Sequence, residues 1–367
     1  MLRKIMLAAT TALLSIGPVM AADDLLTASW DDVVAQAKQE GELNWYVWYF
    51  QPEFREQVKA FEELYGITVN VPDVTSGDDA KNKLLAEAGR DTGDIDVISL
   101  GGDVTNTIDV TSLFYGPILP VLPEADALTD QINGGDGQGY AVAYWGNQTG
   151  MAYDSNRVEL ASLPQTLDEL TAWIDANPGQ LGFNYENGGS GPSFIHNIAR
   201  NILGIAPDAV IDAVPDLTPV WDWFNAREDK FVITGSNADS LTRLNSGEFL
   251  LTPAWEDHLF SLTSKNEVGS QIKLYIPDWG MNGGGNIVGI PANAPNKAAA
   301  LLFVSWLTSA DTQTAFNQRF GTAPANSNAD SSKALVSAAE RANTRLWTMP
   351  INSNDVVPAF IENVVQD

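Results

Sequence analysis

Apolar and polar positions in the first third of the chain follow two alternating patterns. Three stretches carry apolar side chains at helical spacing: 30–39, 52–66 and 78–90. Three shorter runs are mostly apolar and typical of buried strands: 42–50, 67–74 and 94–102. From residue 42 the order is strand, helix, strand, helix, strand, which predicts a parallel sheet wound right-handedly. Ligands of such sheets lie beyond the carboxyl ends of the strands.

A second series of elements follows a glycine-rich turn. The stretch GGDGQGYAVAYWGNQTGMAYD predicts two short strands that are broken at 146–148. Further along, Thr166 and Ser309 each predict the start of a helix, because their hydroxyls can cap a helix N-terminus. The glycine run MNGGGN at 281–286 predicts a loop between two strands. Together these elements predict a second lobe of strands and helices.

The stretch NGGSGPSFIHN, residues 187–197, leads from small residues into a predicted helix. Pro192 suits the first helical position, and Ser190 or Gly191 can cap it. The free N–H groups of such a start can hold an anion, but the turn lacks the lysine of a phosphate-binding loop. Ser190 and Ser193 therefore either contact a ligand or only cap the helix.

Length and composition place the chain among exported globular proteins. Its 367 residues, of which 44% are hydrophobic, suffice for two domains. Residues 1–22 have a basic start, an apolar run and a small-residue site ending at Ala21 or Ala22, which predicts a cleavable signal peptide. No later run approaches the roughly 20 apolar residues of a spanning helix. Cysteine is absent, so disulfides, thiolate metal sites and a lipid-anchored cysteine are excluded. We expect a freely diffusing periplasmic monomer.

The formal net charge of −27 restricts the partners. Removal of Arg3 and Lys4 with the signal peptide makes it −29 for the mature chain. Nucleic acid and anionic lipid are therefore poor partners. The favoured explanation of this charge is a solvated acidic surface, and attraction of a cationic ligand is the alternative.

The ordered combination of several segments resembles the extracellular solute-binding protein family 1, the periplasmic receptors of ABC importers, and within it an uncharacterised branch called Ynj-type. The segments are GELNWYVWYFQPEFREQVKAFEELYGITV, DIDVISLGGD, YAVAYWGNQTGMAYD, LPQTLDELTAWI and NIVGIPANAPNKAAALLFVSWLTSADTQTAFNQRFGTAP. The resemblance covers nearly the whole mature chain.

This resemblance implies an α/β fold of the periplasmic binding protein type II, in which two lobes, each a mixed and mostly parallel sheet flanked by helices, are joined by two chain crossings. The crossings would lie near 143–151 and 287–291. The implied division is a signal peptide at 1–22, a first lobe at 23–146, a second lobe at 147–286, and the remainder of the first lobe with C-terminal helices at 287–367. The ligand would lie between the lobes, and hinge closure would hold it.

An enzymatic function finds little support in the motifs. The glycines of GDGQG at 135–139 follow no strand and open no helix, so a dinucleotide site is not expected. His196 and His258 are the two histidines of the chain, and no nucleophile elbow accompanies them. An exported hydrolase or transferase that depends on these histidines remains a minor alternative.

A metal site is a second alternative. Glu256, Asp257 and His258 could supply ligands to a metal ion. Neighbouring residues on one element point in different directions, however, and acids at a helix N-terminus are explained by the helix dipole. The adjacent late tyrosines that ferric receptors of the resembled family often use do not occur. We therefore assign no metal ligand and no cofactor, and keep a metal or metal-complex receptor as an alternative.

A binding function is supported by aromatic, acidic and amide residues at predicted strand ends and crossings. Aromatic rings with carboxylates suit an ammonium ligand through cation–π contacts, whereas rings with amides suit a sugar or polyol. The candidate ligand-binding residues are Trp48, Tyr49, Gly102, Asp103, Trp145, Asn147, Gln148, Ser190, Ser193, Trp255, Glu256, Trp279 and Asn286. We expect no catalysis: the protein would bind a cationic or zwitterionic organic solute, or a sugar or polyol, and deliver it to an inner-membrane ABC permease.

Overall fold

The computed structural model describes residues 25–207, 209, 213, 215–337, 339–347 and 353–366. The predicted signal peptide at 1–22 lies outside the described residues. The strands are β1 Glu42–Tyr46, β2 Thr68–Asn70, β3 Val97–Gly101, β4 Gln131–Ile132, β5 Gly135–Asp136, β6 Ala141–Asp154, β7 Leu181–Phe183, β8 Phe231–Ile233, β9 Leu251–Trp255, β10 Ile272–Tyr275, β11 Met281–Gly289 and β12 Thr344–Arg345.

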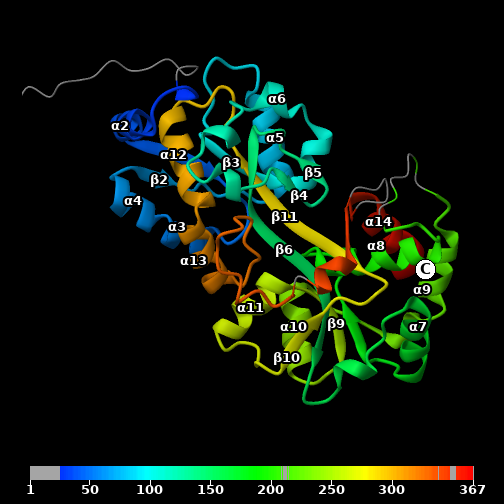
Figure 1. Cartoon of the computed structure of the whole chain (residues 1–367). Coiled ribbons are helices and arrows are strands. Elements are labelled where there is room, and N and C mark those ends of the chain that lie inside the picture. Colours follow the sequence, from blue (N-terminus) through cyan, green and yellow to red (C-terminus); the bar gives the residue numbers. More distant parts are fainter. Residues whose placement is uncertain are drawn as a thin grey trace, which may run out of the picture.

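The helices cover both sides of these strands (Figure 1). The α-helices are α2 Trp30–Glu40, α3 Gln51–Gln57, α4 Lys59–Tyr65, α5 Gly77–Glu87, α6 Val110–Leu113, α7 Leu167–Ala176, α8 Ser190–Ile202, α9 Thr218–Asn225, α10 Asn237–Asn245, α11 Glu256–Ser264, α12 Lys297–Thr308, α13 Ala310–Phe320 and α14 Ser353–Phe360. Short 3-10 helices are η1 Gly102–Thr107, η2 Leu119–Val121, η3 Ala125–Ala127, η4 Leu160–Ser162, η5 Glu228–Lys230 and η6 Glu340–Asn343, and η7 Ile361–Val365 is a π-helix. None of the helices among the described residues is long and apolar enough to cross a membrane.

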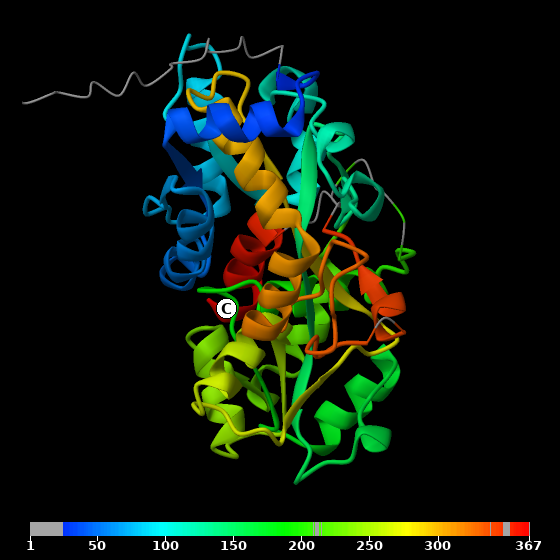
Figure 2. The same cartoon turned by 60° about the vertical axis from the view of Figure 1, so that its left-hand side comes forward.

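The strands form two half-sheets that share two long strands, as the predicted two-lobe α/β fold requires. In the first lobe β2, β1 and β3 are parallel, and β11 pairs antiparallel to β3. In the second lobe β9, β7 and β8 are parallel, and β9 pairs antiparallel to β6. The pair β6 and β11 runs through the middle of the molecule and joins the two lobes (Figures 1 and 2).

Each lobe has its own hydrophobic core, because strands buried on both faces need helices packed on each side. In the first lobe Trp45 of β1 is fully buried between Phe54 of α3 and Phe303 of α12. In the second lobe Phe183 of β7 packs against Phe194 of α8. The core of the first lobe thus includes segments in which an apolar pattern was observed, 42–50 and 52–66.

The two strands that cross between the lobes differ from the sequence prediction. The stretch 141–154 is one continuous strand, not two strands broken at 146–148. The strand stays continuous at residue 146 because glycine has no Cβ. A Cβ on this residue would lie 2.5 Å from the carbonyl oxygen of Ala323, which approaches the strand closely. The predicted loop at 281–286 is likewise part of β11. At both places glycine marks the close approach of another segment, a backbone carbonyl at Gly146 and side chains at 283–285, and it marks a turn at neither.

The predicted helix starts at Thr166 and Ser309 are confirmed. The Thr166 hydroxyl accepts a hydrogen bond from the Glu169 N–H, and the Glu169 side chain completes a capping box before α7. The Ser309 hydroxyl accepts a hydrogen bond from the Thr312 N–H at the start of α13.

The end of the chain divides between the lobes. Residues 287–367 were expected to form the remainder of the first lobe together with C-terminal helices, and α12 and α13 do pack in the first lobe. Val336, Val356 and Phe360 instead belong to the core of the second lobe, where Phe360 contacts Phe224 with ring centroids 5.0 Å apart. Apolar residues of α14 therefore cover α8 and α9 of the second lobe, as Figure 1 shows for the C-terminal helix.

Candidate ligand-binding site

A cavity of about 1000 Å³ lies between the two lobes. The first lobe contributes the residues that follow β1 and β3, which confirms that the cavity meets the carboxyl ends of parallel strands. The N-termini of four helices border it through Ser76 before α5, Gly189 before α8, Asn237 of α10 and Trp255 before α11. The crossing strands β6 and β11 contribute Trp145, Asn147, Gly284, Gly285 and Asn286.

Aromatic rings make up much of the cavity wall. They are Trp48, Tyr49, Phe50, Trp145, Trp255 and Trp347. The ring of Tyr49 lies 5.0 Å from that of Trp48 and 5.2 Å from that of Trp145, centroid to centroid. The Tyr49 hydroxyl is hydrogen-bonded to the Tyr144 hydroxyl at 2.6 Å, and burial raises its pKa well above the ordinary value. Tyr49 is therefore a neutral, fixed part of this wall.

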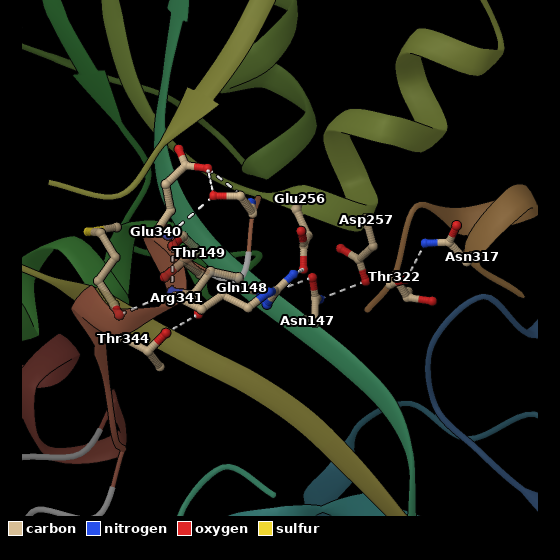
Figure 3. Close-up of polar contacts among 12 residues, drawn as sticks. Asn147, Gln148, Thr149, Glu256, Asp257, Asn317, Thr322, Glu340, Arg341 and Thr344 are labelled. Atoms are coloured by element: carbon tan, nitrogen blue, oxygen red, sulfur yellow. Dashed lines mark hydrogen bonds and ion pairs between the residues drawn. The ribbon is translucent and has the colours of Figure 1, made fainter. Parts of the chain in front are cut away.

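Asp257, at the start of α11, is a buried carboxylate at the cavity. Its Oδ2 accepts a 2.7 Å hydrogen bond from the Asn147 side chain, which comes from β6 (Figure 3). Its Oδ1 accepts a 2.7 Å hydrogen bond from the His258 N–H. Burial nevertheless dominates and raises the pKa of Asp257 to about 6, because these donors only partly replace water. A nearby positive charge would lower that pKa and hold the group ionised.

Asp103, in η1 after β3, is a second carboxylate at the cavity. Its Oδ1 accepts a hydrogen bond of 3.3 Å from the Asn133 side chain. Burial raises its pKa, as it does for Asp257. Lys81, the lysine that lines the cavity, is paired with Asp78 at 3.0 Å. The charge available to a ligand is therefore mainly negative.

Seven of the predicted site residues line this cavity: Trp48, Tyr49, Asp103, Trp145, Asn147, Trp255 and Asn286. They come from the ends of β1, β3 and β9 and from the crossing strands. Position at a strand end or crossing thus indicated these seven cavity residues, but it did not separate them from Gln148 and Trp279, which do not line the cavity.

Glu256, Gly102 and Trp279 do not line the cavity. The Glu256 side chain is fully buried and forms an ion pair with Arg341 at 2.5 Å (Figure 3). Burial outweighs this pairing and raises the pKa of Glu256 to about 7. Gly102 lies where a Cβ would meet the Ile132 carbonyl oxygen, so it is a packing position. Trp279 is buried against Phe194 in the second core.

Gln148 and Ser193 are structural parts of the crossing and not cavity residues. The Gln148 amide donates to the Thr149 carbonyl at 2.8 Å, and its Oε1 accepts a 2.7 Å bond from the Thr344 hydroxyl. The Ser193 hydroxyl is bonded to the Thr149 hydroxyl at 2.7 Å and accepts from the Asn282 N–H at 3.0 Å. Both side chains use their polar atoms to tie β6, β11 and α8 together.

The turn before α8 differs in detail from its prediction. Gly189, and not Ser190 or Gly191, is the N-cap, and Pro192 is the third residue of the helix instead of the first. The Ser190 hydroxyl is buried and donates to the Asn237 side chain at 2.6 Å, so it neither caps α8 nor lines the cavity. The backbone of Gly188 and Gly189 reaches the cavity instead.

Trp347 is a cavity residue that sequence reasoning missed. It follows the two-residue strand β12, which pairs with β11, and its Nε1 donates to the Gly283 carbonyl at 2.6 Å. Asp257 was considered only as a metal ligand, although its neighbour Glu256 was predicted at the site. Of the two acids, the fold turns Asp257 to the cavity and Glu256 to Arg341. Within the described part of the chain, no group of three or more His, Cys, Asp or Glu side chains could hold a metal ion.

Comparison with known proteins gives the same fold. A putative extracellular solute-binding protein of Bordetella parapertussis is 15% identical with a TM-score of 0.68, covering 88% of this chain and 99% of that one. The spermidine/putrescine ABC transporter substrate-binding protein of Streptococcus pneumoniae is 15% identical with a TM-score of 0.65 and the same coverage. The iron-bound protein HitA of Pseudomonas aeruginosa is 18% identical with a TM-score of 0.63, again covering 88% and 99%.

Sequence comparison identifies the family directly. No curated protein sequence matches the chain. The model of the family described as "Bacterial extracellular solute-binding protein" matches residues 56–343. This match spans most of both lobes and most of the residues that line the cavity, although Trp48, Tyr49, Phe50 and Trp347 lie outside it. The chain therefore belongs to the bacterial extracellular solute-binding proteins.

Proposed function

We propose that this protein is the periplasmic, non-catalytic receptor of an ABC importer, and that it captures a cationic or zwitterionic organic solute between its lobes. The closed, loaded form would be delivered to an inner-membrane permease. The observation that carries the proposal is the cavity itself, whose aromatic wall is combined with the carboxylates Asp103 and Asp257. Rings and carboxylates together stabilise an organic cation through cation–π contacts and charge-assisted hydrogen bonds.

A zwitterion is also compatible with the start of α8, which borders the cavity. The first turn of α8 contains no acidic residue, in contrast to those of α5, α10 and α11. Its positive dipole end therefore remains available to a solute carboxylate. Since Gly188 and Gly189 line the cavity there, backbone groups can approach the solute closely.

A thermal-shift screen of amines, amino-acid derivatives, polyols, sugars and phosphorylated compounds tests the proposal. A solute that binds only the folded state raises the unfolding temperature, and the increase grows with the logarithm of its concentration relative to Kd. We expect cations or zwitterions among the solutes that stabilise the protein, and we expect none of them to be chemically converted. Dialysis against a chelator should leave the binding of these solutes unchanged. Chemical conversion of a hit would contradict the receptor function. Stabilisation by sugars or metal ions alone would contradict the proposed solute class.

A further inference from the structure

Trp255 and Trp347 form an unusual pair in the cavity wall. Their rings are inclined by only 21° and their centroids lie 6.5 Å apart. Full contact between two faces requires carbon atoms about 3.5 Å apart, so these faces are not in full contact with each other. A flat group that touched both rings would need planes separated by about 7 Å, twice that contact distance. The observed 6.5 Å is the distance between the ring centroids, so it is the upper limit of the distance between the two planes, and it approaches the separation that a sandwiched group needs.

Neighbouring residues of β11 hold both indoles. A Cβ on Gly284 would lie 2.6 Å from Cζ3 of Trp255, so the ring packs directly on the strand backbone. The adjacent Gly283 accepts the 2.6 Å hydrogen bond from Nε1 of Trp347. Both rings are therefore placed by a regular strand at the crossing, which gives more precise positions than a loop would.

Trp347 reaches the cavity through a segment that we call the C-terminal strap, residues 339–347. Its strand β12 pairs with the start of β11, with Thr344 opposite Met281. The Thr344 hydroxyl donates to Gln148, and Arg341 forms the ion pair with buried Glu256 (Figure 3). The strap is thus fastened to β6, β11 and α11, and residues 339–347 belong to none of the hydrophobic cores.

We propose that Trp255 and Trp347 form a clamp for a flat, delocalised cation of the guanidinium or amidinium type, and that the strap, through Trp347, sets the solute specificity of the cavity. The inference rests on the proposed function in solute capture. A guanidinium is planar, stacks on aromatic faces and is weakly hydrated, so two nearly parallel rings suit it. A primary ammonium is compact and strongly hydrated and gains less from the second ring. Asp103 and Asp257 supply the opposite charge.

Three matched pairs of probes test the clamp by calorimetry: agmatine against 1,4-diaminobutane, arginine against ornithine, and 4-guanidinobutanoate against 4-aminobutanoate. In each pair only the terminal group differs. We expect the guanidinium member of at least one pair to bind about tenfold more tightly, as a cation–π contact of ordinary strength gives. Trp347→Leu should remove that preference, Trp347→Phe should keep most of it, and Trp173→Leu, a tryptophan change on α7 away from the cavity, should leave it unchanged.

Three results would overturn the clamp while leaving the receptor function standing, and the first two concern the wild-type protein. One is that an ammonium member binds as tightly as its guanidinium partner in every pair that binds. The other is that none of the six probes binds although a different solute stabilises the protein. Binding with an unaltered preference in folded Trp347→Leu would also overturn it. If no solute of the broader screen binds, the proposed function itself fails.

Discussion

At the scale of single residues, Asp257 combines features that matter most for a charged solute. It is buried, it lies at the cavity, and its pKa is raised to about 6 by burial. Between about pH 4 and pH 6, the Asp257 carboxyl therefore keeps its proton in the folded protein but is ionised in the unfolded chain. Its contribution to folding stability falls as the pH rises through this window. A bound cation would oppose this loss of stability, because it favours the ionised form of the Asp257 carboxylate.

This coupling predicts a pH-dependent affinity for agmatine, whose two charges persist between pH 5 and pH 7. Because Asp257 ionises through its pKa of about 6, affinity should increase with pH, by up to about tenfold over this range. Asp257→Asn should bind agmatine more weakly and with little pH dependence. Calorimetry at both pH values measures the effect. A wild-type affinity that is independent of pH would show that Asp257 does not face the cation.

Gly284 should be intolerant of a side chain for a local reason. A Cβ at this position would lie 2.6 Å from the Trp255 ring, so Gly284→Ala must displace the ring from its place in the wall. We expect a loss of roughly 1 to 2 kcal/mol in solute binding, the value of one cation–π contact. Gly89→Ala is the control, since a Cβ there would have no atom within 4 Å apart from residue 89 itself and its two chain neighbours. Equal affinities of the two folded variants for any solute found in the screen would refute the assigned role of Trp255.

The sequence indicated many site residues but could not orient all of them. Trp48, Trp145 and Asp103 were found because strand ends and crossings can be read from apolar patterns. Glu256 and Asp257 are adjacent acids at one helix start, and only tertiary packing decides which one meets Arg341. Trp347 was missed because β12 has two residues, too few for a periodic pattern.

At the scale of elements, the strap depends on a charge pair that is costly to break. Arg341 is 23% exposed, whereas Glu256 is fully buried. Removal of the arginine would leave Glu256 as an uncompensated buried carboxylate, which costs about 3 kcal/mol in such settings. The carboxyl can relieve this cost by protonation, because burial already raises its pKa to about 7.

We therefore expect Arg341→Met to lower the free energy of unfolding by about 3 kcal/mol at pH 8 and by less at pH 6, where Glu256 takes up a proton. The double variant with Glu256→Gln should regain much of the loss at pH 8. Chemical denaturation at the two pH values gives the comparison. A loss that is the same at both pH values, and is not recovered in the double variant, would mean that the pair does not fasten the strap.

The crossing strands show what apolar pattern cannot predict. The helices α2, α7 and α13 begin at the predicted residues, because caps and periodicity are local properties. By contrast, the glycines in β6 and β11 were interpreted as breaks. Their actual reason is long-range: Ala323 approaches Gly146, and Trp255 lies on Gly284. Such contacts join parts of the chain that are far apart in sequence, so local patterns do not reveal them.

At the scale of the whole molecule, a polar contact joins the two lobes beside the crossing. Lys265 at the end of α11 pairs with Glu53 of α3 at 3.2 Å. The lysine side chain is 45% exposed, so the pair should stabilise the present arrangement of the lobes by less than about 1 kcal/mol. Lys265→Gln should weaken solute affinity less than about fivefold, and the difference should vanish at high salt. An effect that persists in 1 M salt would show a role other than charge pairing.

The central claim is that a solute is held between two lobes that close around it. Small-angle X-ray scattering on the protein with and without a solute found in the thermal-shift screen tests it most directly. We predict that the solute reduces the radius of gyration of the wild-type protein. In the double variant that carries both Trp255→Ala and Asp257→Asn, the solute should leave the radius of gyration unchanged. A saturating solute that leaves the radius unchanged, or that contracts the double variant equally, would contradict closure on this cavity.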